Sequence, residues 1–275
     1  MIIGDRDFDF EHKSYIMGIL NVTPDSFSDG GRYRQPVAAL KQAEEMVYQG
    51  ASIIDVGGES TRPGYREISW EEETERVIPV IRAIKKKLAV PVSLDTWKYQ
   101  VAAEGIAAGA DMINDIWGLR KDAGEMAGLI AESGLPCCLM HNRFKADYSD
   151  AADFLSGFIT DVDEILRIAG EAGIKEDRII LDPGIGFGKN YEHNLKILKH
   201  LDLMKRWKLP ILLGVSRKSV IGRALDLPVH EREEGTMALT VTGRLFGASI
   251  FRVHDVKSNS RALRMTDAVL NIDGE

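Results

Sequence analysis

The chain has 275 residues, of which 44% are hydrophobic and 28% are charged, a composition typical of a folded globular protein. Its formal net charge of −7 gives no general basic surface, so we expect no nucleic-acid partner. The N-terminus lacks the pattern of a secretory signal, and no apolar run approaches the ~20 residues that span a bilayer. We therefore expect a cytoplasmic protein without a membrane partner.

The chain begins with an extension, residues 1–13, for which we expect a hairpin at the bottom of a barrel. After it, one unit repeats: a short apolar strand, a polar tip and a helix with one apolar face. The predicted strands are 15–20, 52–56, 90–94, 111–116, 135–140, 178–181, 210–215 and 249–253. The predicted helices include 36–49, 70–88 (with Ser69 as N-cap), 97–108 (ended by Gly109), 231–247 and 258–270.

Eight such units without a linker predict a single domain, residues 1–275, folded as a (β/α)8 TIM barrel with a short N-terminal extension. The strands are almost continuously apolar, as parallel strands buried on both faces are. An open doubly wound sheet is the alternative fold. In a barrel, the carboxyl ends of all strands share one rim, and functional side chains are found there.

The two cysteines, Cys137 and Cys138, are neighbours in the strand predicted at 135–140. Neighbouring side chains on a strand point to opposite faces, so we expect neither a disulfide nor a metal site. Both are interpreted as core residues of a protein in a reducing compartment.

The strand tips carry polar side chains that the stability of a barrel does not require. These residues are Asn21, Glu59, Thr61, Arg62, Asp95, Asn114, Asp182, Lys218, Arg252 and His254. Each also has a structural explanation when taken alone. Asp95 is suited to capping the helix that follows it, and Asp182 to a turn before Pro183. Lys218 would be a solvated residue at a helix start, and His254 a polar residue with its hydrogen bonds satisfied. We expect instead that the whole set faces one mouth.

Two kinds of chemistry are present in this set. Arg62, Arg252 and Lys218 suit phosphate oxygens, and the side-chain oxygen of Asn21 suits Mg²⁺ that is shared with a phosphate. The second cluster is Asp95, Asn114 and Asp182, acids and an amide that recognise the edge of an amino-pyrimidinone ring. Apolar walls for a flat ring are available from Ile116, Met140 and Phe187. The sequence therefore predicts a flat heterocycle in the barrel and a diphosphate toward its rim.

The chain resembles the dihydropteroate synthases. The resemblance rests on NVTPDSFSDGG at 21–31 and DVGGESTRPG at 55–64, two specific segments, and it extends from Tyr15 to the last helix. Shorter matches are SLDT at 93–96, IND at 113–115, LDPGIGFGK at 181–189, GVSRKS at 214–219 and FRVHDV at 251–256. Glycine-rich turns such as the one in 181–189 are weak signals alone.

The resemblance implies a transferase of folate biosynthesis. It would condense 6-hydroxymethyl-7,8-dihydropterin diphosphate with 4-aminobenzoate to give 7,8-dihydropteroate and pyrophosphate, with Mg²⁺ as cofactor. It also implies inhibition by sulfonamides, which mimic 4-aminobenzoate, and a homodimer formed by the helices near 231–247 and 258–270.

The resemblance also assigns residues to four roles. The implied catalytic residues are Asp95, Lys218, Arg252, Arg62 and His254. The implied pterin site is Asp95, Asn114, Ile116, Met140, Asp182, Phe187, Gly214, Lys218 and Arg252. The implied diphosphate site is Asn21, Thr61, Arg62, Arg252 and His254, with Asn21 also holding the metal. The implied 4-aminobenzoate site is Phe27, Thr61, Pro63, Phe187, Lys218 and Ser219. Asp29 is a candidate to order the first loop or to hold the amine, and the loops after the first two strands are expected to close over the site.

Two other functions remain open at this point. A methyltransferase that uses methyltetrahydrofolate and a corrinoid protein would share the barrel and the acid–amide cluster, but it does not need the diphosphate residues. A non-catalytic pterin-binding protein would not need Arg62, Lys218, Arg252 and His254 together.

Overall fold

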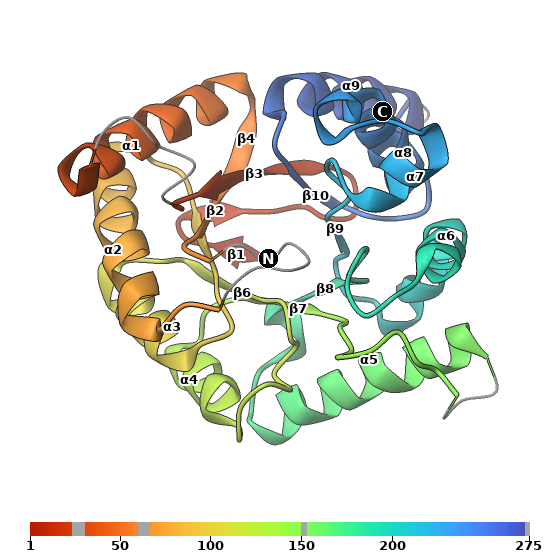
Figure 1. Cartoon of the computed structure of the whole chain (residues 1–275), viewed down its shortest axis with the longest axis horizontal. Coiled ribbons are helices and arrows are strands. Elements are labelled where there is room, and N and C mark those ends of the chain that lie inside the picture. The colour runs from red at the N-terminus through yellow and green to blue at the C-terminus, as the bar shows by residue number, and fades with distance from the viewer. Residues whose placement is uncertain (24–30, 60–66, 150–152, 273–275) are drawn as a thin grey trace.

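Within the described residues, eight parallel strands pair around a central axis (Figure 1). The computed structural model describes residues 1–23, 31–59, 67–149 and 153–272, and for residues 31–35 it describes the backbone alone. The strand order is β8-β7-β6-β5-β4-β3-β10-β9, and a bridge between Leu181 and Ile211 joins the first and last strands. The sheet therefore closes into the predicted barrel. Its strands are β3 (Tyr15–Asn21), β4 (Ala51–Gly57), β5 (Val92–Asp95), β6 (Met112–Asp115), β7 (Cys137–Met140), β8 (Ile179–Asp182), β9 (Leu212–Leu213) and β10 (Ile250–Val253).

Helices surround this barrel as an outer layer (Figure 1). They are α1 (Gly31–Gln49), α2 (Trp70–Lys87), α3 (Tyr99–Ala108), α4 (Glu125–Ser133), α5 (Phe154–Glu171), α6 (Tyr191–Lys199), α7 (Ser219–Leu225), α8 (Glu233–Leu245) and α9 (Val256–Leu270). Short 3₁₀ helices cover Glu176–Arg178, Leu201–Trp207 and Val229–Glu231. None of the described helices has the length and apolar character needed to cross a membrane.

Two of the predicted helix boundaries have a clear local cause. The Ser69 hydroxyl accepts a hydrogen bond from the Glu72 amide at 3.2 Å, so Ser69 is the N-cap of α2 as predicted. Gly109 ends α3 with a positive φ of 103°, which glycine adopts without strain. Both predictions are confirmed.

The alternation of side chains along the strands produces two apolar cores. The larger core lies between the sheet and the helices and includes Cys137. The smaller core fills the barrel and includes Cys138. Both thiols are buried and free, so the prediction of two core cysteines on opposite faces is confirmed. Burial raises the pKa of both thiols, which keeps them protonated and unreactive.

The N-terminal residues form the antiparallel hairpin of β1 (Ile2–Ile3) and β2 (Arg6–Asp7). Ile3 and Phe8 belong to the core inside the barrel. Arg6 donates to the Ala89 carbonyl just before β5, at 2.5 Å. The hairpin therefore covers the end of the barrel at which the strands begin, and the opposite end is left for a binding site.

Several predicted boundaries were wrong, and one of these errors matters for the site. β5 was expected to end at Leu94, but it continues through Asp95, which pairs with Gly57 of β4 and Asn114 of β6. Asp95 is thus held by two neighbouring strands. Helix α1 begins earlier than predicted, with Pro36 inside it rather than at its start, and β9 is limited to two residues.

Candidate active site

The polar floor of the barrel lies one layer above its apolar interior. The interior layer is made by Met17, Ile53, Met112, Cys138, Ile180, Leu212 and Ile250, which share one core. Side chains two positions apart on a strand point to the same face, so the next inward layer follows from the sequence. That layer is Ile19, Asp55, Asp95, Asn114, Met140, Asp182, Gly214 and Arg252. We call Asp55, Asp95, Asn114 and Asp182 the floor.

Arg252 joins two carboxylates of the floor. Its Nε lies 2.6 Å from Asp55 Oδ2, and its Nη2 lies 2.5 Å from Asp95 Oδ2. Asn114 Nδ2 lies 3.4 Å from the same Asp55 oxygen. Side chains from four strands therefore meet at one point, although Asp55 and Arg252 are 197 residues apart in the sequence.

Asp182 belongs to the same cluster. A Cβ atom placed on Gly214 would lie 3.7 Å from Asp182 Oδ2 and 4.0 Å from Arg252 Cβ. Asp182 and Arg252 therefore both border Gly214, and the two side chains share one end of the barrel as predicted. A larger residue in place of Gly214 would narrow this space.

The charges in this cluster are far from bulk water. Burial raises the pKa of the Asp95 carboxyl to about 7, although the positive charge of Arg252 opposes the shift. Burial also raises the pKa of Asp182, against the opposing effect of Lys218. For Lys218, burial lowers the pKa to about 8 and Asp182 opposes the shift. The acids of the floor and the neighbouring cations, Arg252 and Lys218, therefore have charges that depend on each other.

Lys218 forms the side of the site next to the floor. It precedes α7, and its ammonium donates to the Ile185 carbonyl and lies 4.4 Å from the centre of the Phe187 ring. Lys218 is therefore not a solvated residue at a helix start. Ser219 is the first residue of α7.

His254 is oriented by Ser216, which lies near the end of the neighbouring strand. The Ser216 hydroxyl is 2.9 Å from His254 Nδ1 and accepts from the His254 backbone amide at 3.1 Å. The Ser216 hydroxyl therefore fixes both the backbone and the ring of His254 at the end of β10.

The sequence also offered a purely structural role for Asp95, as a helix cap, and for Asp182, as a turn residue, and only the second is observed. Asp95 does not cap a helix, because α3 begins four residues later, at Tyr99. The backbone amide of Lys98 donates instead to Thr96 Oγ1 at 3.2 Å. Asp182 does have the turn role, since its Oδ1 accepts from the Gly184 amide at 2.7 Å. The other carboxylate oxygen of Asp182, Oδ2, faces Gly214.

The remaining predicted residues fall into two groups. Asn21 ends β3, Met140 ends β7, and Ile116 follows β6 with its carbonyl accepting from Asn142 Nδ2 at 3.1 Å. Phe27, Asp29, Thr61, Arg62 and Pro63 lie outside the described residues. The predicted closure of the loops that carry them lies outside the described residues as well.

Two features of this end of the barrel were missed from the sequence. Asp55 was not singled out, because it lies within its strand rather than at the tip. The period-two pattern from Ile53 to Asp55 was the available signal. Glu59 was expected to face the mouth, but it is paired with Lys98, which also binds Glu73 of α2 at 2.6 Å. All three side chains are buried, and no local sequence pattern connects them.

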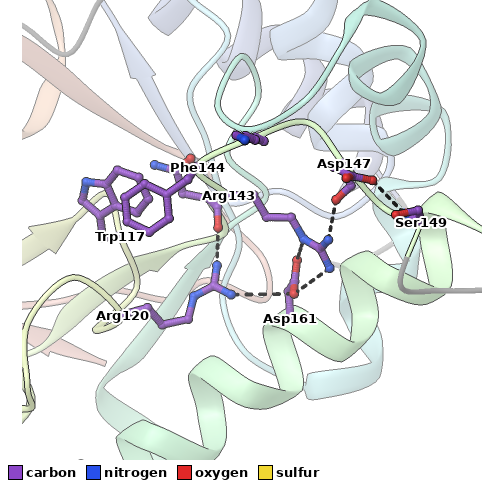
Figure 2. Close-up of a pocket in the computed structure, with 9 residues that line it drawn as sticks. Trp117, Arg120, Arg143, Phe144, Asp147, Ser149 and Asp161 are labelled. Atoms are coloured by element: carbon purple, nitrogen blue, oxygen red, sulfur yellow. Dashed lines mark hydrogen bonds and ion pairs between the residues drawn. The ribbon is translucent and has the colours of Figure 1, made fainter.

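A hollow of about 490 Å³ lies outside this cluster, between the segments that follow β6 and β7 (Figure 2). Trp117 and Phe144 stack at one side of it, with ring centres 4.3 Å apart. At its centre, Arg143 holds Asp161 of α5 through Nε at 2.6 Å and Nη2 at 3.0 Å. The hollow lies outside the inward-facing side chains at the carboxyl ends of the strands, so the floor rather than this hollow is the candidate active site.

The fold and the site together define a class of protein: a barrel enzyme whose binding site lies at the carboxyl ends of the strands. Residues 17–254 match the family described as pterin binding enzyme. The dihydropteroate synthase of Clostridium beijerinckii is 54% identical over 98% of this chain and 99% of that protein.

Two solved structures are similar throughout. One is a dihydropteroate synthase from Clostridium difficile in the presence of pteroic acid, with a TM-score of 0.92, 48% identity and coverage of 96% of this chain and 99% of that one. The other is the Xanthomonas albilineans dihydropteroate synthase with 4-aminobenzoic acid, with a TM-score of 0.91, 38% identity and coverage of 98% and 97%. The chain therefore belongs to the pterin-binding enzymes and, within them, to the dihydropteroate synthases, which are transferases.

Proposed function

We propose that the floor holds the pterin ring of the diphosphate substrate. Asp95 and Asp182 would accept hydrogen bonds from the ring N–H and amino groups, and Asn114 would add a donor and an acceptor. The observation that carries this proposal is the junction of Arg252 with Asp55 and Asp95. A planar guanidinium beside the acids is placed to cover one face of a flat ring.

The walls proposed for the ring are apolar and come from Met140 at the end of β7 and from the segments that follow β6, β8 and β9. They are Ile116, Met140, Phe187 and Gly214, with Lys218 beside them. The 4-aminobenzoate would lie against Phe187, Lys218 and Ser219, together with Phe27, Thr61 and Pro63 from outside the described residues. The closeness of the Lys218 ammonium to the Phe187 ring supports a shared boundary between the two substrates.

The diphosphate is proposed to lie on the basic side of the mouth. Arg252 and His254 would bind it there, with Thr61 and Arg62 as further proposed ligands. Within the described residues no group of three or more His, Cys, Asp or Glu side chains suits a metal. Asn21 offers one hard oxygen, and this fits Mg²⁺ that takes its other ligands from the diphosphate and water. When bound, Mg²⁺ would supply positive charge to the diphosphate oxygens.

The proposed reaction begins with cleavage of the carbon–oxygen bond between the pterin methylene and the diphosphate. The electron pair leaves with the diphosphate, whose charge Arg62 and His254 stabilise. The methylene is left as a cation delocalised over the dihydropterin, and the carboxylates of Asp95 and Asp182 stabilise it. The amine of 4-aminobenzoate then forms the carbon–nitrogen bond and releases a proton. This amine is neutral at pH 7, so we assign no general base.

Pyrophosphate release tests the activity and the charge argument together. The purified protein with pterin diphosphate, Mg²⁺ and 4-aminobenzoate should release one pyrophosphate for each dihydropteroate formed. In Asp95→Asn, kcat/KM should fall more than tenfold, because the neutral amide no longer stabilises the cation. The exposed Asp202→Asn is the matched control and should retain wild-type kinetics.

The possible outcomes separate three readings. A pterin-binding protein without catalysis would release no pyrophosphate, and a methyltransferase would act on a methyl donor instead. Near wild-type kinetics in Asp95→Asn would remove the role of the carboxylate charge. Sulfonamides should raise the apparent KM for 4-aminobenzoate, as competing ligands do.

We also propose a homodimer formed through α8 and α9. The two helices are joined by Arg244 and Asp267, whose Nε and Oδ1 atoms lie 2.7 Å apart, and they lie side by side in Figure 1. Their outer surface exposes Leu245 at 54%, Met265 at 63% and Val269 at 60%. Exposed apolar side chains on two adjacent helices favour association with a second copy.

The dimer proposal predicts that Met265→Glu combined with Val269→Glu halves the molar mass measured by light scattering. Two buried carboxylates at the interface would oppose association. Val37→Glu, a change at a similarly exposed position on α1, should keep the dimer mass. A wild-type monomer at micromolar concentration would contradict the proposal. The reduced cysteines support a cytoplasmic location for this assembly.

A further inference from the structure

The ammonium of Lys189 connects two segments that border the proposed pterin site. Its Nζ lies 2.7 Å from His141 Nδ1, directly after β7. On the other side it lies 3.0 Å from the Gly184 carbonyl and 2.9 Å from the Phe187 carbonyl, in the loop after β8. The His141 carbonyl lies 3.3 Å from the same nitrogen, so four acceptors surround Nζ.

His141 is itself fixed from the outer layer. Its side chain is fully buried, and Nε2 lies 2.8 Å from Asp161 Oδ2 of α5. The charged carboxylate of Asp161 can only accept, so Nε2 carries the proton that is donated to it, and Nδ1 of the neutral ring is left to accept from Lys189. Burial lowers the pKa of Lys189, and its nitrogen donates to Nδ1 with or without the third proton. Consistent with a neutral ring, burial together with the nearby charge of Lys189 lowers the pKa of His141 to about 3.

Asp161 is held in place for this role. Figure 2 shows Arg143 and Arg120 converging on it from the segments after β7 and β6. Burial raises the pKa of Asp161, but hydrogen bonds from His141 and Arg143 outweigh this effect and lower it to about 2. The carboxylate therefore stays charged and anchors the imidazole to α5 at neutral pH.

The loop that Lys189 holds contains or contacts three residues of the proposed site. The Gly184 amide donates to Asp182 at 2.7 Å, and the Ile185 carbonyl accepts from Lys218. Phe187 supplies the ring beside the Lys218 ammonium. A shift of this loop would therefore displace the acid, the cation and the wall together.

The two segments touch through their backbones, which leaves little tolerance for such a shift. A Cβ on Gly184 would lie 1.9 Å from the His141 carbonyl oxygen, and one on Gly188 would lie 2.4 Å from the Arg143 amide nitrogen. Both glycines have positive φ, at 66° and 54°. Among the described residues, two side chains connect these segments through hydrogen bonds: Lys189, which contacts His141 at Nδ1 and at its carbonyl, and Tyr148, whose hydroxyl donates to the Gly188 carbonyl at 3.2 Å. Of the two, Lys189 also contacts the Gly184 and Phe187 carbonyls within the loop.

We propose that Lys189 is a positioning residue for the reaction. Bound to His141, it fixes the loop of residues 183–188 so that Asp182 and Phe187 are aligned with the pterin ring. This inference rests on the proposed assignment of those two residues to the pterin site. Lys189 acts through them rather than on the reacting atoms.

Lys189→Met tests the proposal, because methionine has a similar length and no donors. We expect kcat/KM for the pterin diphosphate to fall by about ten- to a hundredfold, with a raised KM, since small misplacements of binding groups have effects of this size. A purely structural role would lower the folded fraction and the apparent kcat but leave KM unchanged. Lys199→Met, at an exposed position of α6, is the matched control and should match the wild type.

His141 supplies a second test that does not depend on the folding of the lysine variant. In His141→Asn, the side-chain oxygen takes a position near that of Nδ1 and still accepts from Lys189. In His141→Phe, the ring volume remains without any acceptor. The asparagine variant should retain a kcat/KM closer to the wild type than the phenylalanine variant does.

The outcomes distinguish this inference from the function on which it rests. A wild-type protein that releases no pyrophosphate would overturn the proposed function. An active wild type whose Lys189→Met variant keeps the wild-type KM would overturn only the positioning role. Equal kcat/KM values in the two His141 variants would overturn it as well.

Discussion

Arg252→Met is expected to lower kcat by about 10²- to 10³-fold, the range seen when one preorganised charge-stabilising donor is removed from an active site. It is also expected to reduce the free energy of unfolding by about 3–5 kcal/mol, because Asp55 and Asp95 would remain buried without their cation. In the wild type, these carboxylates raise the pKa of Arg252 despite the opposing effect of burial. Steady-state kinetics and urea denaturation measure the two effects separately.

A series of variants separates charge from geometry at this position. Arg252→Lys keeps the positive charge but replaces the planar fork with one ammonium, so it should be intermediate in activity. Adding Asp55→Asn to Arg252→Met should recover part of the stability without recovering activity. Arg82→Met, at an exposed position of α2, should leave both properties unchanged. Wild-type turnover in Arg252→Met would contradict the proposed role of Arg252 at the diphosphate and pterin.

The barrel was predictable because its signal repeats. Eight apolar strands with polar tips give the strand order and the rim, and a boundary error of one or two residues does not alter that outcome. The same error did matter at Asp95, which was assigned to a loop although it lies within β5. Reading the alternation inward from each strand, rather than only its tip, would have placed Asp55 beside Asp95 and Arg252.

Other parts of the site had no sequence signal that we can identify. Lys189 and His141 are 48 residues apart, and their contact depends on the close approach of two loops at Gly184 and Gly188. Lys98 meets Glu59 and Glu73 only because α2 packs beside β4 and β5. Such contacts are set by tertiary packing. The predictions for Phe27, Thr61, Arg62 and Pro63 remain predictions.

The buried cluster of Lys98, Glu59 and Glu73 leads to the second prediction of large effect. Burial lowers the pKa of Lys98, but the hydrogen bonds that its ammonium donates to Glu59 and Glu73 outweigh this effect and raise it. Lys98→Met would leave two carboxylates buried without a cation, and we expect a loss of about 3–5 kcal/mol in the free energy of unfolding. Lys86→Met, at an exposed position in the last turn of α2, is the matched control and should change it little.

The pH dependence of Lys98→Met identifies the cause of that loss. Burial already raises the pKa of Glu59 in the wild type, and removing Lys98 should raise it further. A carboxyl whose pKa is higher in the folded than in the unfolded state binds more protons when folded, so stability falls as pH rises. The variant should therefore recover stability as pH is lowered from about 8 toward the raised carboxyl pKa. If the loss in the free energy of unfolding is instead the same across this pH range, the cause is lost packing. Methionine would then destabilise the fold through its shape and not through the unpaired carboxylates.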